Sequence, residues 1–508
     1  TCALPIWPDK KKSMLLANAP IAATLRPCRE DESAVMKDDD KEITYKRSGS
    51  VDFDTTENLY IEGDNLDVLK LLRETYLNRV KMIYIDPPYN TGKDFIYEDD
   101  FAEETGEFLR RDGQYDEQGN RLTPNLDSNG RFHTDWLNMI YPRLRVARDL
   151  LTDDGVIFIS IDDNEVENLK KICNEVFGES NFVCSLIWQK KTGASDAVTI
   201  ATITEYIHVY CKNIGKVKFT KNNESYDLKR YRYQDEYVSE RGPYYIDNLD
   251  RGGLQYSDSL NYGIECPDGT IAFPNGRTEF VNDGWIWKWG KAKVAWARTN
   301  HFIEFRQSTS KQSGWSVCYK NYLNVDNENK PIERAAPHKN LILDVMNANA
   351  AAIMKDIFNT NNYFDYSKPM DLIKKFISLV QMKNNDIVLD FFSGSATTAH
   401  SVMQLNAEDG GKRKFIIVQL PEVTNEKSEA YKAGYKNICE IGKERIRRAG
   451  KKIKEENKDK EGIGNLDTGF RVLKLDSSNM KDVYYTPKEY AQMGFNLDGF
   501  MDNIKPDR

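Results

Sequence analysis

The chain has 508 residues, of which 40% are hydrophobic and 30% are charged, and its formal net charge is -8. The length predicts roughly two to three domains. The composition is typical of a globular protein and excludes a disordered chain, and no apolar run approaches the length of a membrane span. The negative charge argues only weakly against a nucleic-acid partner, because phosphate binding needs a local basic surface and not a basic total.

The eight cysteines and five histidines are scattered along the chain without Cys-x-x-Cys pairs or zinc-ligand spacing. We therefore expect no metal site, and a reducing, cytoplasmic location. The sequence begins at Thr1 without an initiator methionine, and no signal-peptide pattern follows. We expect no targeting segment and no membrane association.

The N-terminal half is predicted to alternate helices with strands after a polar start. Residues 1–45 are polar and of mixed charge, and we expect little regular structure there. Apolar residues at helical spacing predict helices, and β-prone apolar runs predict buried strands. The helices are expected at residues 66–72, 136–151 and 166–176, and the strands at residues 81–85 and 156–161.

The pattern changes between residues 190 and 345, where short β-like runs and many turns replace the alternation. Five of the eight tryptophans lie between Trp285 and Trp315. We predict a separate, β-rich domain here. The α/β alternation then resumes, with helices expected at residues 370–380 and 397–405, strands at residues 387–391 and 414–420, and a basic helical stretch at residues 443–460.

Neither half has enough strands for a sheet of its own, so the two halves are expected to share one sheet. The predicted organisation is an N-terminal polar segment, the two halves of an α/β core, an inserted domain between them, and the start of a C-terminal region. The corresponding ranges are residues 1–45, 46–189 and 346–460, 190–345, and 461–508.

Two motifs stand at the ends of predicted strands. Asp86-Pro87-Pro88-Tyr89 follows the strand at residues 81–85, and Asp390-Phe391-Phe392-Ser393-Gly394 closes the strand at residues 387–391. Open α/β sheets bind ligands at the carboxyl ends of their strands, so both motifs are candidate sites. Taken alone, the first would be read as a proline turn capped by Asp86, and the second could be a plain strand-to-helix turn.

In this order the two motifs resemble those of amino-directed DNA methyltransferases, in the branch whose Asp-Pro-Pro-Tyr motif precedes the cofactor glycine motif. Residues 60–66, 82–95, 155–162 and 386–420 are similar to the modification (Mod) subunit of type III restriction-modification systems, and the resemblance covers residues 45–475. It implies a Rossmann-like α/β methyltransferase core, interrupted by a mixed, β-rich target-recognition domain.

The implied function is transfer of a methyl group from S-adenosylmethionine to the adenine amino group at a specific DNA sequence. The implied partners are double-stranded DNA with an extruded base, a second Mod subunit and a helicase-nuclease Res subunit. Two alternatives remain open. One is methylation of the cytosine amino group, although such relatives usually carry serine in place of Asp86. The other is a DNA-binding specificity subunit whose catalysis has lapsed, which only Ala396 favours.

The resemblance assigns catalysis to Asp86, Pro87, Pro88 and Tyr89. An exocyclic amino group is a poor nucleophile because its lone pair is delocalised into the base. The Asp86 carboxylate and the Pro87 carbonyl can accept the amino protons and return the lone pair to nitrogen, while the prolines fix the backbone. Tyr89 offers a ring on which an extruded base can stack.

The second motif is expected to bind the cofactor. Gly394 suits a close approach of the cofactor to the backbone, where a Cβ would collide. Asp390 is the expected partner of the methionine ammonium group, and Phe391 or Phe392 can face the sulfonium. The family has a second glycine where this chain has Ala396, which adds one methyl group at the close approach.

Three further positions are candidates for cofactor contact. The resemblance assigns Lys368-Pro369, at the start of the helix before the second motif. Glu422, just after the strand at residues 414–420, could bind the ribose hydroxyls. Asp64 lies in another family motif and could contact the cofactor or cap the helix that follows it.

Basic and aromatic residues alternate at two places in the inserted domain, and such surfaces suit DNA. Arg230 and Arg232 are the better candidates for DNA contact, and Lys288 is a third. The tryptophans around Lys288 are spaced as in a half-buried strand, so we favour a core role for them. The basic stretch at residues 443–460 could touch phosphate or form a solvated face.

Overall fold

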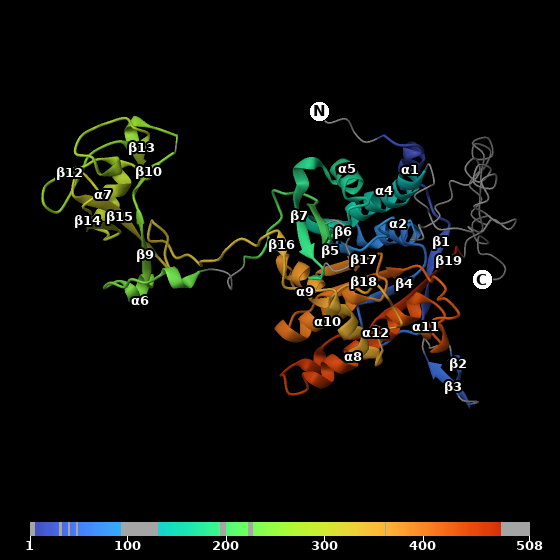
Figure 1. The fold of residues 1–508 in the computed structure, drawn as a ribbon. Helices are drawn as coiled ribbons and strands as arrows, with labels where there is room; N and C mark the ends of the chain where they lie inside the picture. Colours follow the sequence, from blue (N-terminus) through green and yellow to red (C-terminus); the bar gives the residue numbers. More distant parts are fainter. Residues whose placement is uncertain are drawn as a thin grey trace, which may run out of the picture. The chain divides into compact units, whose positions relative to one another are not determined.

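The structure, a computed structural model, describes residues 6–29, 33–38, 41–46, 49–92, 131–193, 200–221, 227–253, 255–360 and 362–478. The chain forms two compact units. Unit 1 combines Thr1–Thr220 with Lys339–Arg508, and unit 2 is Lys221–His338. Figure 1 traces both units along the sequence.

Unit 1 is built on a ten-stranded sheet of order β1-β19-β4-β18-β17-β5-β6-β8-β7-β16. The six strands from β19 to β6 in this order run parallel to one another. Their bounds are Leu59–Glu62 (β4), Val80–Ile85 (β5), Leu151–Ile161 (β6), Ile387–Asp390 (β17), Lys414–Gln419 (β18) and Arg471–Ser477 (β19). The predicted α/β core with one sheet shared by both halves is confirmed, since β17 pairs directly with β5.

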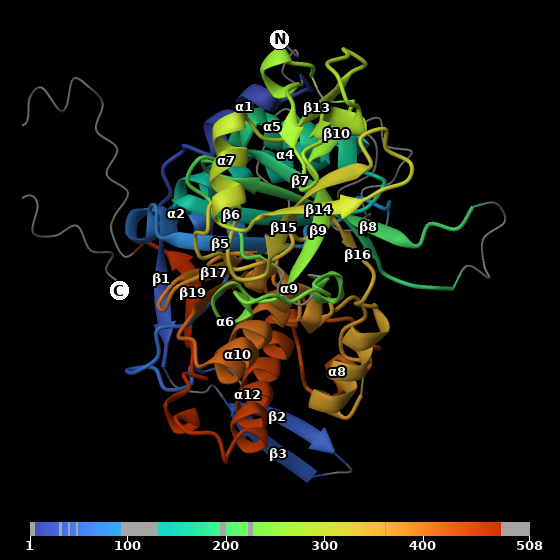
Figure 2. The ribbon, with the colours of Figure 1, turned by 90° about the vertical axis from the view of Figure 1, so that its left-hand side faces the viewer.

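Helices cover both faces of this sheet, as Figures 1 and 2 show. One face carries α2 (Asn65–Tyr76), α4 (Phe132–Leu150) and α5 (Val166–Phe177), and the other carries α8 (Ala348–Phe358), α9 (Met370–Leu379), α10 (Thr397–Asp409) and α12 (Ile438–Glu456). Side chains of β5 alternate between the two cores, because successive residues of a strand point to opposite faces. Ile83 and Ile85 pack on the first face, whereas Met82 and Tyr84 pack on the second.

The centre of the sheet has the geometry of a ligand site. β17 continues into α10 on one face, while the chain after β5 leads to α4 on the other face. The chain therefore leaves two adjacent parallel strands in opposite directions, which opens a crevice at their carboxyl ends. Asp86 and Asp390 stand at these two strand ends.

Two strands at one edge of the sheet come from the terminal parts of the described chain: β1 lies in the N-terminal polar segment and β19 in the C-terminal region. β1 (Ala23–Cys28) pairs antiparallel with β19, and α1 (Lys10–Leu16) packs on α4. The expectation of little regular structure in residues 1–45 is therefore wrong: β1 gains backbone hydrogen bonds from a partner more than four hundred positions away, which local composition does not reveal. Within the predicted C-terminal region 461–508, the described part ends at residue 478.

The compact inserted unit is shorter than the predicted range 190–345. β8 (Thr204–Cys211) pairs antiparallel with both β6 and β7 (Phe182–Gln189), so it belongs to the core sheet. β16 (Leu341–Ile342) pairs parallel with β7. Unit 2 begins and ends between these strands, at residues 221 and 338.

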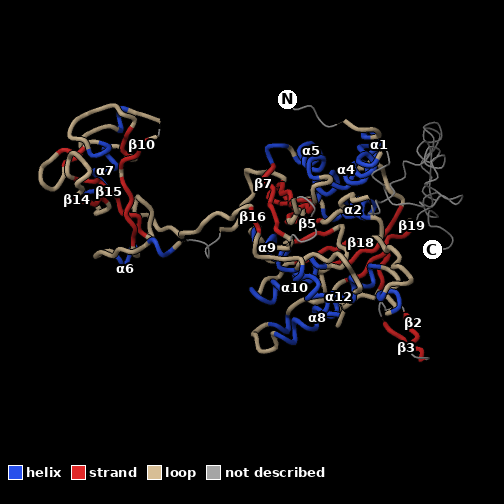
Figure 3. Tube along the Cα trace, in the orientation of Figure 1, coloured by secondary structure: helices blue, strands red, loops and turns tan. Residues whose placement is uncertain are grey.

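Strands and loops make up most of unit 2, as the colouring of Figure 3 shows. Its largest sheet has the order β14-β15-β9, and its main helix is α7 (Lys291–Thr299). The bounds of the strands are Tyr244–Asn248 (β9), Asp250–Gly252 (β10), Ile264–Glu265 (β11), Ile271–Ala272 (β12), Trp285–Trp287 (β13), Ile303–Gln307 (β14) and Trp315–Tyr322 (β15). Trp287 and Trp289 are buried in its core, so the predicted core role of the alternating tryptophans is confirmed for these two.

Among the described helices, none is both long and apolar enough to cross a membrane.

Candidate active site

The turn that follows β5 is fixed by side chains from α4 and from the start of α5. The carbonyl of Pro88 accepts a 2.7 Å hydrogen bond from Nε1 of Trp136. Asn90 has a φ of 60° and is 1% exposed, and its amide donates to Oε1 of Glu165 at 2.6 Å. These buried contacts hold the two prolines and Asp86 in one orientation.

Charged groups surround the predicted catalytic carboxylate. Oδ1 of Asp86 accepts a 2.9 Å hydrogen bond from the Tyr89 hydroxyl and lies 3.2 Å from Nζ of Lys368. Nζ of Lys368 also donates to the Tyr89 hydroxyl at 2.7 Å and to Oε2 of Glu205 at 2.9 Å. Lys190 reaches the other oxygen of Glu205 at 3.0 Å. Among the described residues both contacts to Asp86 use Oδ1, so Oδ2 has no partner in this part of the chain and can accept a hydrogen bond from a ligand.

The protonation states of this network follow from burial and charge. Burial raises the pKa of Asp86, and Glu205 adds to the rise while Lys368 opposes it. Burial acts in the same direction on Glu205, but Lys368 and Lys190 outweigh it and lower the pKa of that carboxyl. Burial, Asp86 and Glu205 raise the pKa of Tyr89 well above its ordinary value. Tyr89 is therefore a neutral phenol beside two carboxylates.

Asp390, at the end of β17, is buried, and nearby residues of the same turn donate hydrogen bonds to its carboxylate. Its Oδ2 accepts a 2.5 Å hydrogen bond from the Thr398 hydroxyl, and its Oδ1 accepts one of 3.1 Å from the amide of Phe392. Burial raises the pKa of Asp390 to about 7. In this conformation both carboxylate oxygens are engaged, so contact with a methionine ammonium group stays a prediction.

Gly394 is required by the turn itself. Its φ is +51°, and its amide donates a 2.7 Å hydrogen bond to Oε1 of Gln419 on β18. A Cβ at this position would lie 3.0 Å from Cζ of Phe364. From the sequence, we expected glycine here because a ligand would approach the backbone closely. The structure gives two further reasons: the backbone is in the left-handed region, which favours glycine, and the side chain of Phe364 leaves little room for a Cβ.

Two residues further on, Ala396 is also in the left-handed region, with a φ of 62°. It is completely buried and immediately precedes α10, where it occupies the cap position without a side chain that could cap the helix. Alanine is strained in this conformation because its Cβ lies close to the following carbonyl oxygen. The family's glycine would relieve that strain.

Asp64 caps α2, accepting hydrogen bonds from the amides of Leu66 and Asp67 at 2.8 and 3.2 Å. The capping role considered from the sequence is therefore present. The buried guanidinium of Arg143 donates to Oδ2 of Asp64 at 3.0 Å and also to Asn65. The Asn65 amide in turn donates to the carbonyl of Phe391 at 2.8 Å, which links the start of α2 to the turn after β17.

The remaining predicted cofactor positions lie in different surroundings. Pro369 is the cap of α9, and Lys368 just before it points into the Asp86 network described above. Glu422 follows β18 and is exposed. Of these residues, the structure brings only Lys368 into contact with the catalytic motif.

The predicted DNA-binding residues all lie in unit 2. Arg230 and Arg232 are exposed, and the guanidinium of Arg230 lies 3.6 Å from the centre of the Tyr245 ring. Lys288 forms a 3.0 Å ion pair with Asp247, so part of its charge is already compensated. Arg230 and Arg232 are thus the freer pair for contact with a ligand.

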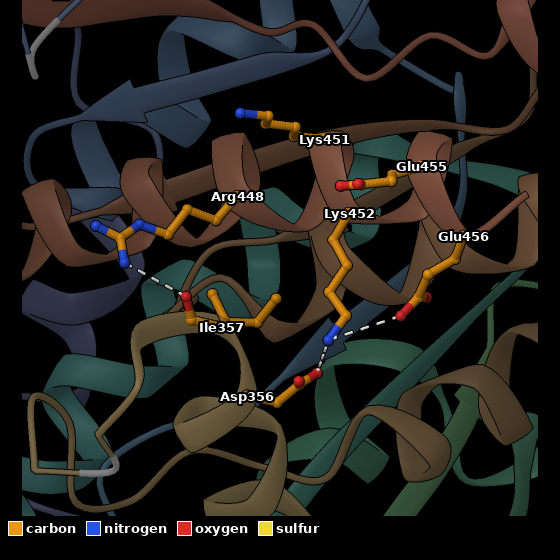
Figure 4. A pocket seen from close by; sticks show the side chains of 7 residues that line it. All are labelled: Asp356, Ile357, Arg448, Lys451, Lys452, Glu455 and Glu456. Carbon is orange, nitrogen blue, oxygen red and sulfur yellow. Dashed lines mark hydrogen bonds and ion pairs between the residues drawn. The ribbon is translucent and has the colours of Figure 1, made fainter. Parts of the chain in front are cut away.

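The basic stretch at residues 443–460 corresponds mostly to α12, and its outer side forms several ion pairs. Acidic and basic side chains together line a shallow hollow between α8 and α12, where Lys452 forms ion pairs with Asp356 and with Glu456 (Figure 4). Arg448 pairs with Glu444 at 2.7 Å. The solvated-face interpretation holds for this side, but Arg445 is buried, so the stretch is not one continuous exposed surface.

Sequence reasoning did not single out Glu205 or Glu165 and did not place Arg445 in the core. Glu205 lies on β8, which the sequence assigned to the inserted domain, and Glu165 directly precedes α5. No local pattern marks either carboxylate. Their one sequence signal is an acidic residue at the edge of an apolar run, and this signal is common on protein surfaces.

Comparison with known proteins places this site in a family. A family model described as DNA methylase matches residues 80–449. The Mod subunit of the type III restriction-modification enzyme StyLTI from Salmonella typhimurium is 34% identical over 466 residues, which are 88% of this chain and 66% of that protein. The EcoPI Mod subunit of Escherichia phage P1 is 32% identical, over 88% of this chain and 68% of that protein.

The EcoP15I Mod subunit of Escherichia coli is 31% identical over 98% of this chain and 74% of that protein. The chain thus spans between 66% and 74% of the lengths of these three relatives. The matches cover both strand-end motifs and the unit between them. The chain therefore belongs to the DNA methylase family, among the Mod subunits of type III restriction-modification enzymes.

Proposed function

We propose that this chain transfers a methyl group from S-adenosylmethionine to the exocyclic amino group of adenine in a specific DNA sequence, as the Mod subunit of a type III restriction-modification system. One observation carries the proposal. The Asp86 motif and the Asp390-Gly394 motif stand at the carboxyl ends of adjacent parallel strands, where the chain leaves the sheet in opposite directions. A base and a methyl donor bound at these ends would meet.

The roles of the catalytic residues follow from their contacts. Tyr89 and Lys368 hold Oδ1 of Asp86, which directs Oδ2 and the Pro87 carbonyl toward the amino protons of the base. Lys368 also favours the anionic form of Asp86, the form that accepts hydrogen bonds. The Tyr89 ring would stack on the extruded base while its hydroxyl stays within the network.

The cofactor side is fitted for a molecule with several polar groups. S-adenosylmethionine supplies the electrophilic methyl group when it is bound. Asp390, Phe391, Phe392 and Gly394 would bind it at the end of β17, with Lys368-Pro369 at the start of α9. Asp64 and Glu422 are further candidates at neighbouring strand ends. The crowding at Gly394 and the completely buried guanidinium of Arg445 beside this turn fit a closely packed, charged ligand.

Unit 2 is proposed to read the DNA sequence. It contributes neither chemical motif, and it exposes Arg230 and Arg232 on a strand-rich fold. Further proposals follow from membership of the family: a second copy of the chain as partner, a helicase-nuclease Res subunit, and a cytoplasmic location.

The test is to express the chain in a host without DNA methylation and to sequence the host DNA for modified bases. The proposal expects N6-methyladenine within one short sequence motif. Methylated cytosine at the site, or no modification despite folded protein, would contradict it. An Asp86→Ala variant expressed in parallel is the control for background modification.

A further inference from the structure

A buried positive charge lies beside the glycine turn. Arg445 on α12 has no exposed surface, and among the described residues no carboxylate pairs with it. Burial lowers the pKa of Arg445 to about 9, so the group is still a cation at neutral pH. Burying a cation without a partner is costly, because the charge loses its hydration. Such a cation is a candidate for a functional role.

One nitrogen of this guanidinium binds three hydroxyl groups. Nη1 of Arg445 lies 2.9 Å from Oγ of Ser367, 2.8 Å from Oγ of Ser395 and 2.7 Å from Oγ1 of Thr397. Ser367 directly precedes the Lys368-Pro369 segment, while Ser395 and Thr397 flank Ala396 where the turn meets the start of α10. Arg445 thus joins the two segments that are assigned to the cofactor.

The charge is not satisfied by these contacts. Within the described part of the chain, Nε and Nη2 of Arg445 have no hydrogen-bond partner. The three hydroxyl oxygens share the two hydrogens of Nη1 and lie 2.9 to 3.4 Å from one another. Their own protons are shared within the cluster and can be donated to an incoming acceptor. Ser367 is partly exposed, so the cluster can be reached from outside.

The start of α10 adds to the positive potential. This helix of 13 residues has no acidic residue in its first turn and no side chain that caps it. Backbone amides at a helix N-terminus favour an anion. Asp390 bonds Thr398 in this turn, but burial raises its pKa to about 7, so it offsets only part of the charge at neutral pH.

We propose that Arg445 positions the carboxylate of the methionine portion of S-adenosylmethionine, through the hydroxyls of Ser367, Ser395 and Thr397 and the first turn of α10. The inference rests on the proposed function and assigns one ligand group to one cluster. The carboxylate brings the negative charge that Arg445 lacks. The same cluster holds the Lys368 segment against the glycine turn, so binding of the carboxylate also sets the distance between the two segments.

The test compares two ligands that differ only in this group: S-adenosylmethionine and its decarboxylated analogue. Calorimetry on the full chain should show that the wild type prefers S-adenosylmethionine. Arg445→Met should weaken binding of S-adenosylmethionine by about 30-fold or more, because the bound carboxylate loses a nearby buried positive charge, with less than about a threefold change for the analogue. Arg445→Lys should keep part of the preference because it keeps the charge.

Two further variants make the result decisive. Ser367→Ala removes the partly exposed hydroxyl and one contact of Arg445 but keeps the buried charge, and it should also lower the preference for S-adenosylmethionine, by several-fold. Arg448→Met removes a cation from the same helix and should change neither affinity. Circular dichroism of each variant confirms that it is folded.

Equal losses for both ligands in Arg445→Met would show a merely structural role and overturn the proposal. Unchanged affinities in Arg445→Met, or a preference that survives in both Arg445→Met and Ser367→Ala, would overturn it as well. A wild type that binds both ligands without discrimination contradicts only this inference. A wild type that binds neither contradicts the proposed methyltransferase function itself.

Discussion

Lys368 connects the two halves of the site at a single atom. Its Nζ contacts Asp86, Tyr89 and Glu205, although the sequence places it with the cofactor residues. Burial would lower the pKa of Lys368, but Asp86 and Glu205 outweigh this effect and raise it, so it stays a cation. The catalytic carboxylate therefore depends on a cation from the cofactor half and on a second carboxylate from β8.

Replacing Asp86 should abolish chemistry and spare cofactor binding. Asp86→Asn keeps the shape of the side chain but loses the anionic acceptor, which is worth about 3 kcal/mol of transition-state stabilisation, or more than a hundredfold in rate. Single-turnover methylation of an oligonucleotide measures the rate, and calorimetry measures the affinity for S-adenosylmethionine.

The exposed Asp153, which pairs with Lys216, provides the control Asp153→Asn, and this change should leave both quantities as in the wild type. An Asp86→Asn variant that keeps more than a tenth of the wild-type rate would show that the amino group is activated by another residue.

Asp390 should make the free protein less stable as the pH rises. Its pKa is raised from 3.8 to about 7 in the folded chain, so folding favours its protonated form. The stability that this group contributes is fully present below about pH 4 and is lost as the pH rises through about 7. Each pKa unit is worth about 1.4 kcal/mol, so the loss is at most about 4 kcal/mol.

Asp390→Asn removes this titration. Without cofactor, the variant should unfold at a higher temperature than the wild type at pH 8, and the difference should shrink toward pH 5. Thermal unfolding at both pH values measures the effect. Parallel pH profiles for the two proteins would mean that Asp390 ionises normally.

At the scale of elements, the start of α10 is held under strain. Ala396 takes a left-handed conformation at the junction of turn and helix, and the helix has no capping side chain. The turn is nevertheless fixed, because the amide of Ala396 donates to the carbonyl of Ser393 at 2.9 Å and the amide of Gly394 donates to Gln419. The surrounding contacts therefore impose the backbone that the alanine disfavours.

Ala396→Gly should stabilise this junction. Alanine in the left-handed conformation costs roughly 1 to 2 kcal/mol, which glycine would relieve. Glycine loses more conformational entropy on folding, and this loss offsets about 0.5 to 1 kcal/mol of the gain. The net gain in the free energy of unfolding is between about 0 and 1.5 kcal/mol, measured by urea denaturation. The same substitution inside the helix, Ala399→Gly, should lower that free energy by about 1 kcal/mol. If both variants lose stability alike, the strain at Ala396 is absent.

At the scale of the whole molecule, chemistry and recognition belong to different compact units. Both strand-end motifs, Glu205 and Arg445 lie in unit 1, whereas Arg230 and Arg232 lie in unit 2. The limits of unit 2 are residues 221 and 338, so β8 and its Glu205 stay with the core. This boundary decides how the recognition unit can be exchanged.

Exchanging residues 221–338 for the matching segment of a related enzyme should move methylation to that enzyme's DNA site, with Asp86 still essential. Exchanging residues 190–345 instead also replaces β8 and the carboxylate that faces Lys368, and we expect a lower methylation rate. Modified-base sequencing reads both chimeras. An active 221–338 chimera that keeps the original site would refute the assignment of recognition to unit 2.

The sequence by itself determined the family, the α/β alternation and the two strand-end motifs, because each is a local pattern. Strand propensity, the turn residues after a strand and the order of the motifs are all carried by short segments. The core role of Trp287 and Trp289 followed in the same way from their spacing of two.

Only the tertiary structure decided which distant residues complete the site. Glu205 meets Lys368 across 163 positions, and Arg445 meets Ser367 across 78. The pairing of β1 with β19 and the place of β8 in the core sheet depend likewise on partners that are remote in sequence. Such contacts arise when strands align and helices pack, so hydrophobic periodicity, which reports only which face of an element is buried, cannot specify them.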